Sequence, residues 1–259
     1  MTARKRLRSD LAWSTADRIV VGGHDLAEEL IGKVSLGDFA FLELKGRLPT
    51  AAESTVFNAI TITLVEHGMT PSAIAARMTL LGAPESLQGA VAAGLLGLGD
   101  RFGGPVDDAA RMLQEAFARA PAGVEPAELA RQVVAARQAA GQLVAGLGHP
   151  LHKPVDPRVP RLFAVAADHG FSGRYVDLMV RIGAEAERVT GKTLPINATG
   201  AIAAIASELE IPWQVCRGLA VMARAIGLVA HLQEELRDPL AAEIWTRVDE
   251  ESSDHLRPG

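Results

Sequence analysis

Polar residues able to do chemistry are concentrated in one short stretch, GLGHPLHKPVDPR, which runs from Gly146 to Arg158. Two histidines, His149 and His152, lie three residues apart, and Arg158 follows an Asp-Pro pair. An imidazole can donate or accept a proton near neutral pH, and a guanidinium can bind a carboxylate through two parallel hydrogen bonds. Histidines and an arginine in one short loop indicate a site for an anionic small molecule.

Two other kinds of site do not fit the glycines and histidines of this stretch. Gly146-x-Gly148 lacks the third glycine and the preceding strand of a dinucleotide-binding loop, and Pro150 blocks the expected helix start. The same proline argues against a helical metal pair at His149 and His152, and no third ligand lies near them in the sequence. We therefore predict no metal site, and we interpret the two glycines as positions where the backbone approaches a ligand closely.

Two further residues, Arg224 and His67, also indicate an anion site. Arg224 lies in the apolar stretch VMARAIGLVAHL, where a charged side chain must reach water, pair with an acid or face an anion. The nearest acids in the sequence, Glu234 and Glu235, are about three helical turns away, which favours the anion. His67 ends an apolar helix directly before Gly68, where it is also suited to complement the helix dipole.

Length and composition restrict the class of protein. The 259 residues are 48% hydrophobic but only 4% aromatic, which predicts one large domain with a core of small aliphatic side chains. The net charge of −5 predicts no nucleic-acid or membrane partner, and we interpret the basic start, residues 1–9, as a solvated tail. No signal peptide and no apolar run of about 18 residues is visible, so we expect a soluble cytoplasmic protein. The single cysteine, Cys216, lies in an apolar stretch and is expected in the core.

Helical periodicity dominates the chain and predicts a nearly all-α fold. The one expected strand is Arg18–Val21, in a small N-terminal hairpin. The Pro- and Gly-containing segment 121–126 is the candidate hinge within a single domain of residues 1–259. The predicted helices cover residues 36–44, 51–67, 71–81, 85–98, 105–120, 126–140, 157–168, 174–190, 197–209 and 212–236, with a last short helix from 239.

Four stretches, in this order along the chain, resemble the citrate synthase superfamily: GHDLAEELIGKVSLGDFAFLELKGRLPT, GLGHPLHKPVDPR, LPINATGA and VMARAIGLVAHL. The resemblance extends from about Trp13 to Trp245. The compact length and the corner GDRFGG look closer to the citryl-CoA lyase module of ATP-citrate lyase. The resemblance implies an all-α fold with a large and a small helical subdomain, and a homodimer whose active sites are completed across the interface.

The resemblance also implies a reaction and a role for individual residues. Members of the family join or split a C–C bond between a CoA thioester and an α-keto acid, typically acetyl-CoA and oxaloacetate, with no metal and no tightly bound cofactor. His149 matches the family histidine at the keto or alkoxide oxygen. The positions matching the family's carboxylate ligands are His67, Arg158 and Arg224. Those expected to lie against CoA are Gly146, Leu147, Gly148 and Asn197.

Two departures from the family pattern affect the expected mechanism. Phe102 stands where synthases have their first catalytic histidine, a feature that the lyase module shares. Thr199, in INATG, stands at the position of the catalytic aspartate, and a threonine hydroxyl cannot act as a general base near neutral pH. A substitute proton carrier would be His152, Asp156 or a bound water. Citryl-CoA cleavage is the leading expectation; the alternatives are another acyl-CoA condensation, thioester hydrolysis, or a non-catalytic paralogue that binds acyl-CoA or a di- or tricarboxylate.

Overall fold

Helices dominate the structure, a computed structural model that describes residues 7–99, 105–149 and 151–256. The all-α prediction is confirmed, and the expected helices begin and end within about three residues of the observed ones. The helices are α1 (Leu36–Lys45), α2 (Ala51–Val65), α3 (Pro71–Gly82), α4 (Leu87–Leu96), α5 (Pro105–Arg119), α6 (Pro126–Ala139), α7 (Arg158–Asp168), α8 (Arg174–Thr190), α9 (Ala198–Glu208), α10 (Trp213–Arg237) and α11 (Ala241–Ser253), with a π-helical turn η1 (Leu26–Leu30) and a 3-10 turn η2 (Asp254–Leu256).

The N-terminal strand prediction is confirmed in part. The expected strand corresponds to β2 (Ile19–Val21), which pairs with β1 (Ala12–Ser14) on one side and β3 (His24–Asp25) on the other, so the hairpin is a three-stranded antiparallel sheet. Gly22 and Gly23 form the two-residue turn between β2 and β3 with φ of 55° and 87°. Positive φ at both central residues matches the right-handed twist of a hairpin.

Side-chain caps determine where several helices start. Thr50 and Glu53 form a capping box at the start of α2, and Thr70 caps α3 ahead of Pro71. The C-terminal end of α1 is determined by Gly46, which has a φ of 69°. In this conformation its amide donates to the Leu42 carbonyl of the last helical turn. Such signals are local, which is why the sequence alone predicts these helix ends well.

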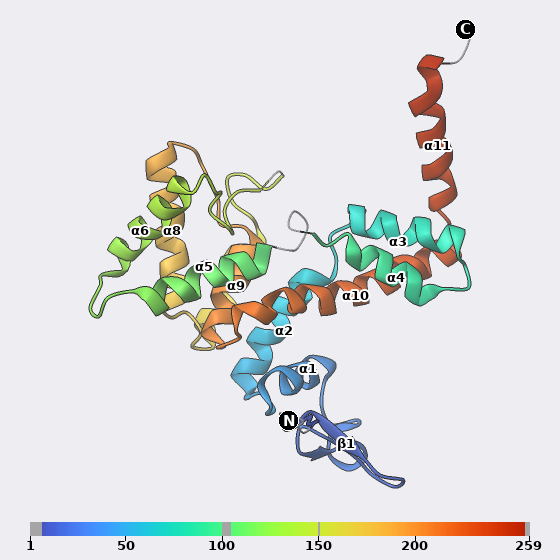
Figure 1. Ribbon diagram of the computed structural model, residues 1–259, viewed down its shortest axis with the longest axis horizontal. Helices are drawn as coiled ribbons and strands as arrows, with labels where there is room; N and C mark the ends of the chain where they lie inside the picture. The colour runs from blue at the N-terminus through green and yellow to red at the C-terminus, as the bar shows by residue number, and fades with distance from the viewer. Residues whose placement is uncertain (1–6, 100–104, 150, 257–259) are drawn as a thin grey trace, which may run out of the picture.

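The helices are arranged along α10, which follows the long axis of the molecule (Figure 1). At one end α5, α6, α8 and α9 form a lobe, at the other α3 and α4 lie against α10, and α11 projects away from the rest. The main core is built from α2 and α5–α10, and a smaller cluster joins α3, α4 and α10. Small residues permit this close packing: a Cβ on Gly94 of α4 would lie 2.7 Å from Leu228 of α10.

The segment expected as a hinge, residues 121–126, connects α5 to α6, and both helices contribute to the main core. A hinge there stays a prediction. Among the described helices, α10 alone is long and apolar enough to cross a membrane, and half of its apolar window is buried inside the protein. That burial is typical of a core helix. Cys216 on α10 is fully buried, as expected, and burial raises the pKa of its thiol to about 12.

Candidate active site

The loop of residues 146–148, which leads to His149, is held against the segment that begins α9. The Gly148 amide donates to the Pro195 carbonyl at 2.7 Å, and the Asn197 amide donates to the Gly146 carbonyl at 3.0 Å. The Asn197 side chain adds a bond to the Gly148 carbonyl at 2.8 Å. These bonds position His149 relative to the first turn of α9.

Two glycines make this close approach possible. Gly146 has a φ of 84°, and a Cβ at this position would lie 2.6 Å from the Gly200 Cα. A Cβ on Gly200 would lie equally close, at 2.6 Å from the Gly146 carbonyl oxygen. Gly146 therefore brings the backbone against α9, where sequence analysis anticipated a ligand. Gly148 has a φ of 78° and open space beside it. Leu147 packs against the core and pairs with Ile196. The CoA contacts expected at both residues stay predictions.

The orientation of the His149 ring follows from its backbone contacts. Its Nδ1 atom accepts hydrogen bonds from the amides of Leu151, at 3.1 Å, and His152, at 2.9 Å. A neutral imidazole in this position carries its proton on Nε2. Burial, and then the neighbouring His152, lower the pKa of His149. The ring is therefore neutral at pH 7 and offers an Nε2–H donor.

Three imidazoles converge at the site although one comes from a distant part of the chain. The rings of His149 and His152 stack with centroids 4.2 Å apart, and His67, just after α2, lies 6.2 Å from the His149 ring. Their ligand-capable nitrogens all lie within 4.8 Å of one another. The third ligand that sequence analysis did not find is thus present, and three imidazoles are a donor set suited to Zn²⁺.

The surrounding charge favours an anion over a metal ion at this cluster. Burial lowers the pKa of His67, and the positive charges of Arg158 and Arg224 lower it further. The same two guanidinium groups would repel a divalent cation and attract a carboxylate. The prediction of no metal site is kept on this ground.

Arg158 is held rigidly by a buried acid. Asp156 is fully buried and accepts from Arg158 Nε at 2.9 Å, Arg158 Nη2 at 2.8 Å and the Ala198 amide of α9 at 3.0 Å. Burial opposes ionisation of Asp156, but these hydrogen bonds prevail and lower its pKa to about 2. A carboxylate with so low a pKa is a poor proton acceptor at neutral pH, so Asp156 is the least suited of the substitute proton carriers, and their identity stays a prediction.

No acid in the described part of the chain pairs with the buried nitrogens of Arg224. Among the described residues, its Nε and Nη1 atoms are buried without a hydrogen bond. Glu234 and Glu235, the nearest acids in the sequence, bind Arg77 of α3 instead. Burial lowers the pKa of Arg224, while Glu66 opposes the shift. Unpaired buried donors on a cation are what an anion site requires, because leaving them unpaired without a ligand is costly.

The remaining predicted residues lie at α9 or outside the described chain. Asn197 caps α9 by accepting from the Gly200 amide at 3.1 Å, so both ends of its side-chain amide are engaged within the protein. Thr199 lies half-buried in the first turn of α9, next to the Ala198 amide that Asp156 binds. Phe102 lies outside the described residues. His152 had no role assigned from the family pattern, and its ring is part of the site.

Comparison with known proteins matches the chain to one family and to solved structures of similar fold. The family described as citrate synthase, C-terminal domain, matches residues 15–245. A citryl-CoA lyase structure from Hydrogenobacter thermophilus is similar over 90% of this chain and 88% of its own, with 33% identity and a TM-score of 0.81. An ATP citrate lyase structure from Methanothrix soehngenii, in complex with citrate and coenzyme A, is 22% identical and shares the fold, with a TM-score of 0.75 over 92% of this chain and 40% of its own.

Curated relatives have longer chains. ATP-citrate synthase beta chain protein 1 of Oryza sativa subsp. japonica is 31% identical over 71% of this chain, and a probable ATP-citrate synthase of Dictyostelium discoideum is 26% identical over 86%. The chain spans about a third of their length, 32% and 37%. The family match covers nearly the whole sequence, and it agrees with the helical fold and with the four motifs in their order. The chain therefore belongs to the citrate synthase family.

Proposed function

We propose that this protein is a citryl-CoA lyase that cleaves citryl-CoA into acetyl-CoA and oxaloacetate. The observation that carries the proposal is the convergence of His67, His149 and His152 with Arg158 and Arg224. This convergence combines three imidazoles with fixed positive charge. The substrate has the matching groups, a tertiary hydroxyl and two free carboxylates. The similarity to citryl-CoA lyase over nearly the full length of both chains supports it.

Recognition of the substrate rests on the two guanidinium groups. Arg224 offers buried donors that have no partner among the described residues. Asp156 orients Arg158 through its Nε and Nη2 atoms. The Nη1 atom of Arg158 makes no hydrogen bond with the described residues, so it can donate to the substrate. His67 adds a neutral donor between them. Fixed donors of this kind hold the carboxylates of the keto-acid half, so that the scissile C–C bond has one orientation. The CoA half is proposed to lie along the face of residues 146–148 near Asn197, as a substrate with no tightly bound cofactor.

His149 stabilises the oxygen that changes most during cleavage. Its Nε2–H donates to the substrate hydroxyl oxygen, which becomes an alkoxide and then the keto oxygen of oxaloacetate. The hydroxyl proton leaves as the C–C bond breaks, and the acetyl-CoA enolate must gain one proton at carbon. One group that takes the first proton and returns it to carbon balances the reaction. We assign this role to His152, because Thr199 has no useful pKa and the Asp156 carboxylate is already occupied by hydrogen bonds from Arg158 and Ala198.

The test is direct cleavage of citryl-CoA with release of oxaloacetate measured by a coupled reduction. We expect turnover by the wild type and its loss in His152→Ala. A further arm is Thr199→Asp, which restores the family's acid in the first turn of α9 and is expected to increase turnover. No oxaloacetate release at high enzyme concentration, with malyl-CoA and citramalyl-CoA also inert, would remove the proposal.

A second candidate, a non-catalytic paralogue that binds a carboxylate or acyl-CoA, is favoured by one observation. Thr199 replaces the acid on which the family's proton transfer depends. Citrate or acyl-CoA binding by calorimetry, with no turnover on a CoA-ester panel, would support it. Turnover that His149→Ala abolishes would exclude it.

We also propose that the protein acts as a cytoplasmic homodimer with active sites completed across the interface. Several helices present apolar side chains to solvent in the described chain, α10 and α11 among them, and α11 projects away from the body of the protein (Figure 1). Exposed apolar surface of this kind indicates a partner, and the family resemblance suggests a second copy. The exposed apolar residues are Val215, Val221, Met222, Ile226, Val229 and Leu236 on α10, and Trp245 and Val248 on α11.

A further inference from the structure

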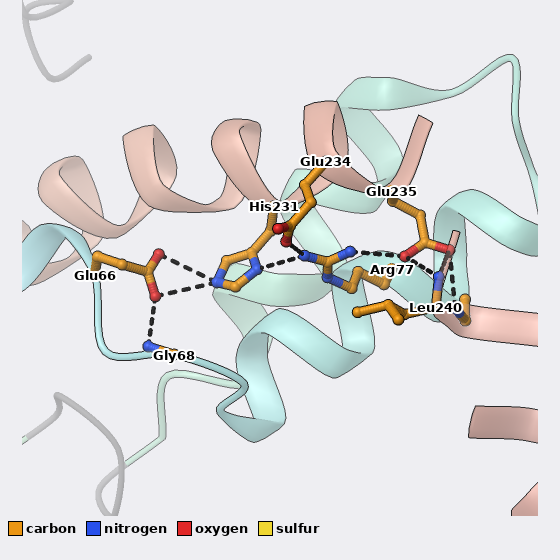
Figure 2. A network of polar contacts seen from close by, with 8 residues as sticks. Glu66, Gly68, Arg77, His231, Glu234, Glu235 and Leu240 are labelled. Carbon is orange, nitrogen blue, oxygen red and sulfur yellow. Dashed lines mark hydrogen bonds and ion pairs between the residues drawn. The ribbon is translucent and has the colours of Figure 1, made fainter. Parts of the chain in front are cut away.

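A buried network of polar side chains connects α3 to α10. At its centre is Arg77 of α3, which is fully buried. Its Nη1 donates to Glu235 at 2.8 Å, and its Nη2 contacts Glu234 and His231 Nδ1, the latter at 3.0 Å (Figure 2). A buried cation is stable only when acids and acceptors lie close to it, and here they engage both Nη atoms, whereas Nε has no partner among the described residues.

Arg77 determines which nitrogen of His231 carries a proton. A guanidinium has donors only and keeps its charge at any ordinary pH. Nδ1 of His231 must therefore accept from Arg77, and the proton of the ring lies on Nε2. That atom faces the Glu66 carboxylate at 3.1 Å and donates to it. His231 is buried, with 8% of its surface exposed. Because Arg77 fixes the tautomer of its ring, the Nε2–H of His231 holds the Glu66 carboxylate in place.

Glu66 in turn holds the turn that carries His67. Its Oε1 atom accepts from the backbone amide of His67 at 2.7 Å. It also accepts from the amide of Gly68 at 2.6 Å, a contact that Figure 2 shows. These residues directly follow the end of α2, so no helical hydrogen bond determines their conformation. The Glu66 carboxylate replaces those bonds and so fixes the backbone position from which the His67 side chain extends.

The face of α10 fits this arrangement. Arg224, Gly227 and His231 are spaced by three and four residues, which places them on one face of the helix. A Cβ on Gly227 would lie 2.1 Å from the Val65 carbonyl oxygen. The end of α2 therefore rests on α10 between Arg224 and His231, and only glycine permits it.

From these contacts we propose that Arg77, His231 and Glu66 are positioning residues for carboxylate recognition. They hold His67 beside Arg224, so that both face one carboxylate of the substrate. None of the three has to touch the substrate. The inference rests on the proposed function for the identity of the ligand, and on geometry alone for the positioning.

Citrate binding by calorimetry tests the effect on recognition, and Glu66→Ala is the decisive variant. Glu66 is a negative charge near an anion site, so if charge alone mattered its removal would strengthen citrate binding. Positioning predicts the opposite, a weakening of about tenfold, the loss expected from one charge-assisted hydrogen bond. Unchanged or tighter binding would overturn the proposal. Glu66 is half exposed, so the variant is expected to fold.

Variants of His231 separate positioning from simple filling of the core. In His231→Gln the amide can still accept from Arg77 and donate to Glu66, whereas His231→Leu fills the space without either bond. We expect citrate affinity within about threefold of wild type for the glutamine and about tenfold weaker for the leucine. Equal affinities for the two variants would contradict the inference. The control is His255→Leu near the C-terminus, where the side chain is exposed and distant from α10 in the chain.

Two NMR measurements are independent of any ligand. The imidazole nitrogen shifts of His231 are expected to show the Nε2–H tautomer in the wild type. Amide hydrogen exchange at His67 and Gly68 is expected to become faster in Glu66→Ala. If the wild type neither binds citrate nor cleaves citryl-CoA, the proposed function fails while these measurements still decide the positioning; an Nδ1–H tautomer or unchanged exchange would refute it.

Discussion

At the scale of single residues, two backbone amides decide what His149 can do. They occupy Nδ1 and leave Nε2–H for the substrate oxygen. We expect His149→Ala to lower kcat for citryl-CoA cleavage about 10²- to 10³-fold, the usual loss when one donor to a developing oxyanion is removed. Circular dichroism should show an unchanged fold, because the ring lies in a loop. A kcat within tenfold of wild type would show that another group stabilises the alkoxide.

Asp156 links the site to stability in acid. Its pKa is about 2 in the folded protein against an ordinary value of 3.8, so the folded state binds this proton more weakly than the unfolded state. Its stabilisation is therefore complete above pH 4 or so, and is lost as the pH falls toward 2. We expect Asp156→Asn to be less stable than wild type by about 2 kcal/mol at pH 7, with the difference shrinking between pH 4 and pH 2.

Denaturant unfolding at pH 7 and pH 3 measures this difference. Asp249→Asn, an exposed position on α11, is the matched control and is expected to behave as wild type at both values. A pH-independent difference for Asp156→Asn would mean that lost packing, and not ionisation, explains its effect.

Sequence patterns identified most site residues but not how they are held. His149, Arg158, Arg224 and His67 could be selected because charge and imidazole are unusual beside so many apolar side chains. For Arg158 the leading prediction was a ligand carboxylate and the alternative a surface ion pair; the sequence did not show that its partner, Asp156, is buried in the same loop. The network around Arg77 was missed altogether, since its members are far apart in sequence and form no motif.

At the scale of elements, Gly227 controls the contact between α2 and α10. Its Cβ would meet a backbone carbonyl, which cannot move without displacing the end of α2. We expect Gly227→Ala to lower the free energy of unfolding by about 1–3 kcal/mol and to weaken citrate binding. Gly218→Ala, on the same helix with open space at its Cβ, is expected to raise it by up to about 1 kcal/mol. Similar denaturant midpoints for the two variants would contradict this account of the contact.

Helix boundaries were predictable because their signals are local, whereas helix contacts were not. Thr50 and Gly46 mark helix ends through their own backbone neighbourhood. The contact between Gly146 and Gly200 joins a loop to the first turn of α9, and a glycine in a sequence does not reveal what approaches it. The sequence therefore predicted which segments are helical, and the structure was needed to see that the glycine before the site packs against α9.

At the scale of the whole molecule, the projecting helix α11 is the feature that a single chain leaves unexplained. Trp245 and Val248, three residues apart on this helix, are each 61% exposed. Burying two such side chains against a second copy would stabilise the pair by several kcal/mol, since each full burial contributes about 1.5–3 kcal/mol. We therefore expect light scattering to give twice the chain mass of 27.3 kDa for the wild type.

The double variant Trp245→Asp with Val248→Asp tests whether the sites depend on that pairing. Charges at these positions should dissociate the dimer, because an unpaired carboxylate cannot be buried in an apolar contact. If active sites are completed across the interface, citryl-CoA cleavage per chain falls with dissociation and recovers as protein concentration rises. Val189→Asp, an exposed apolar position on α8, is the control and should leave mass and activity unchanged. A fully active monomer would show that each chain carries a complete site, and that α11 has another partner.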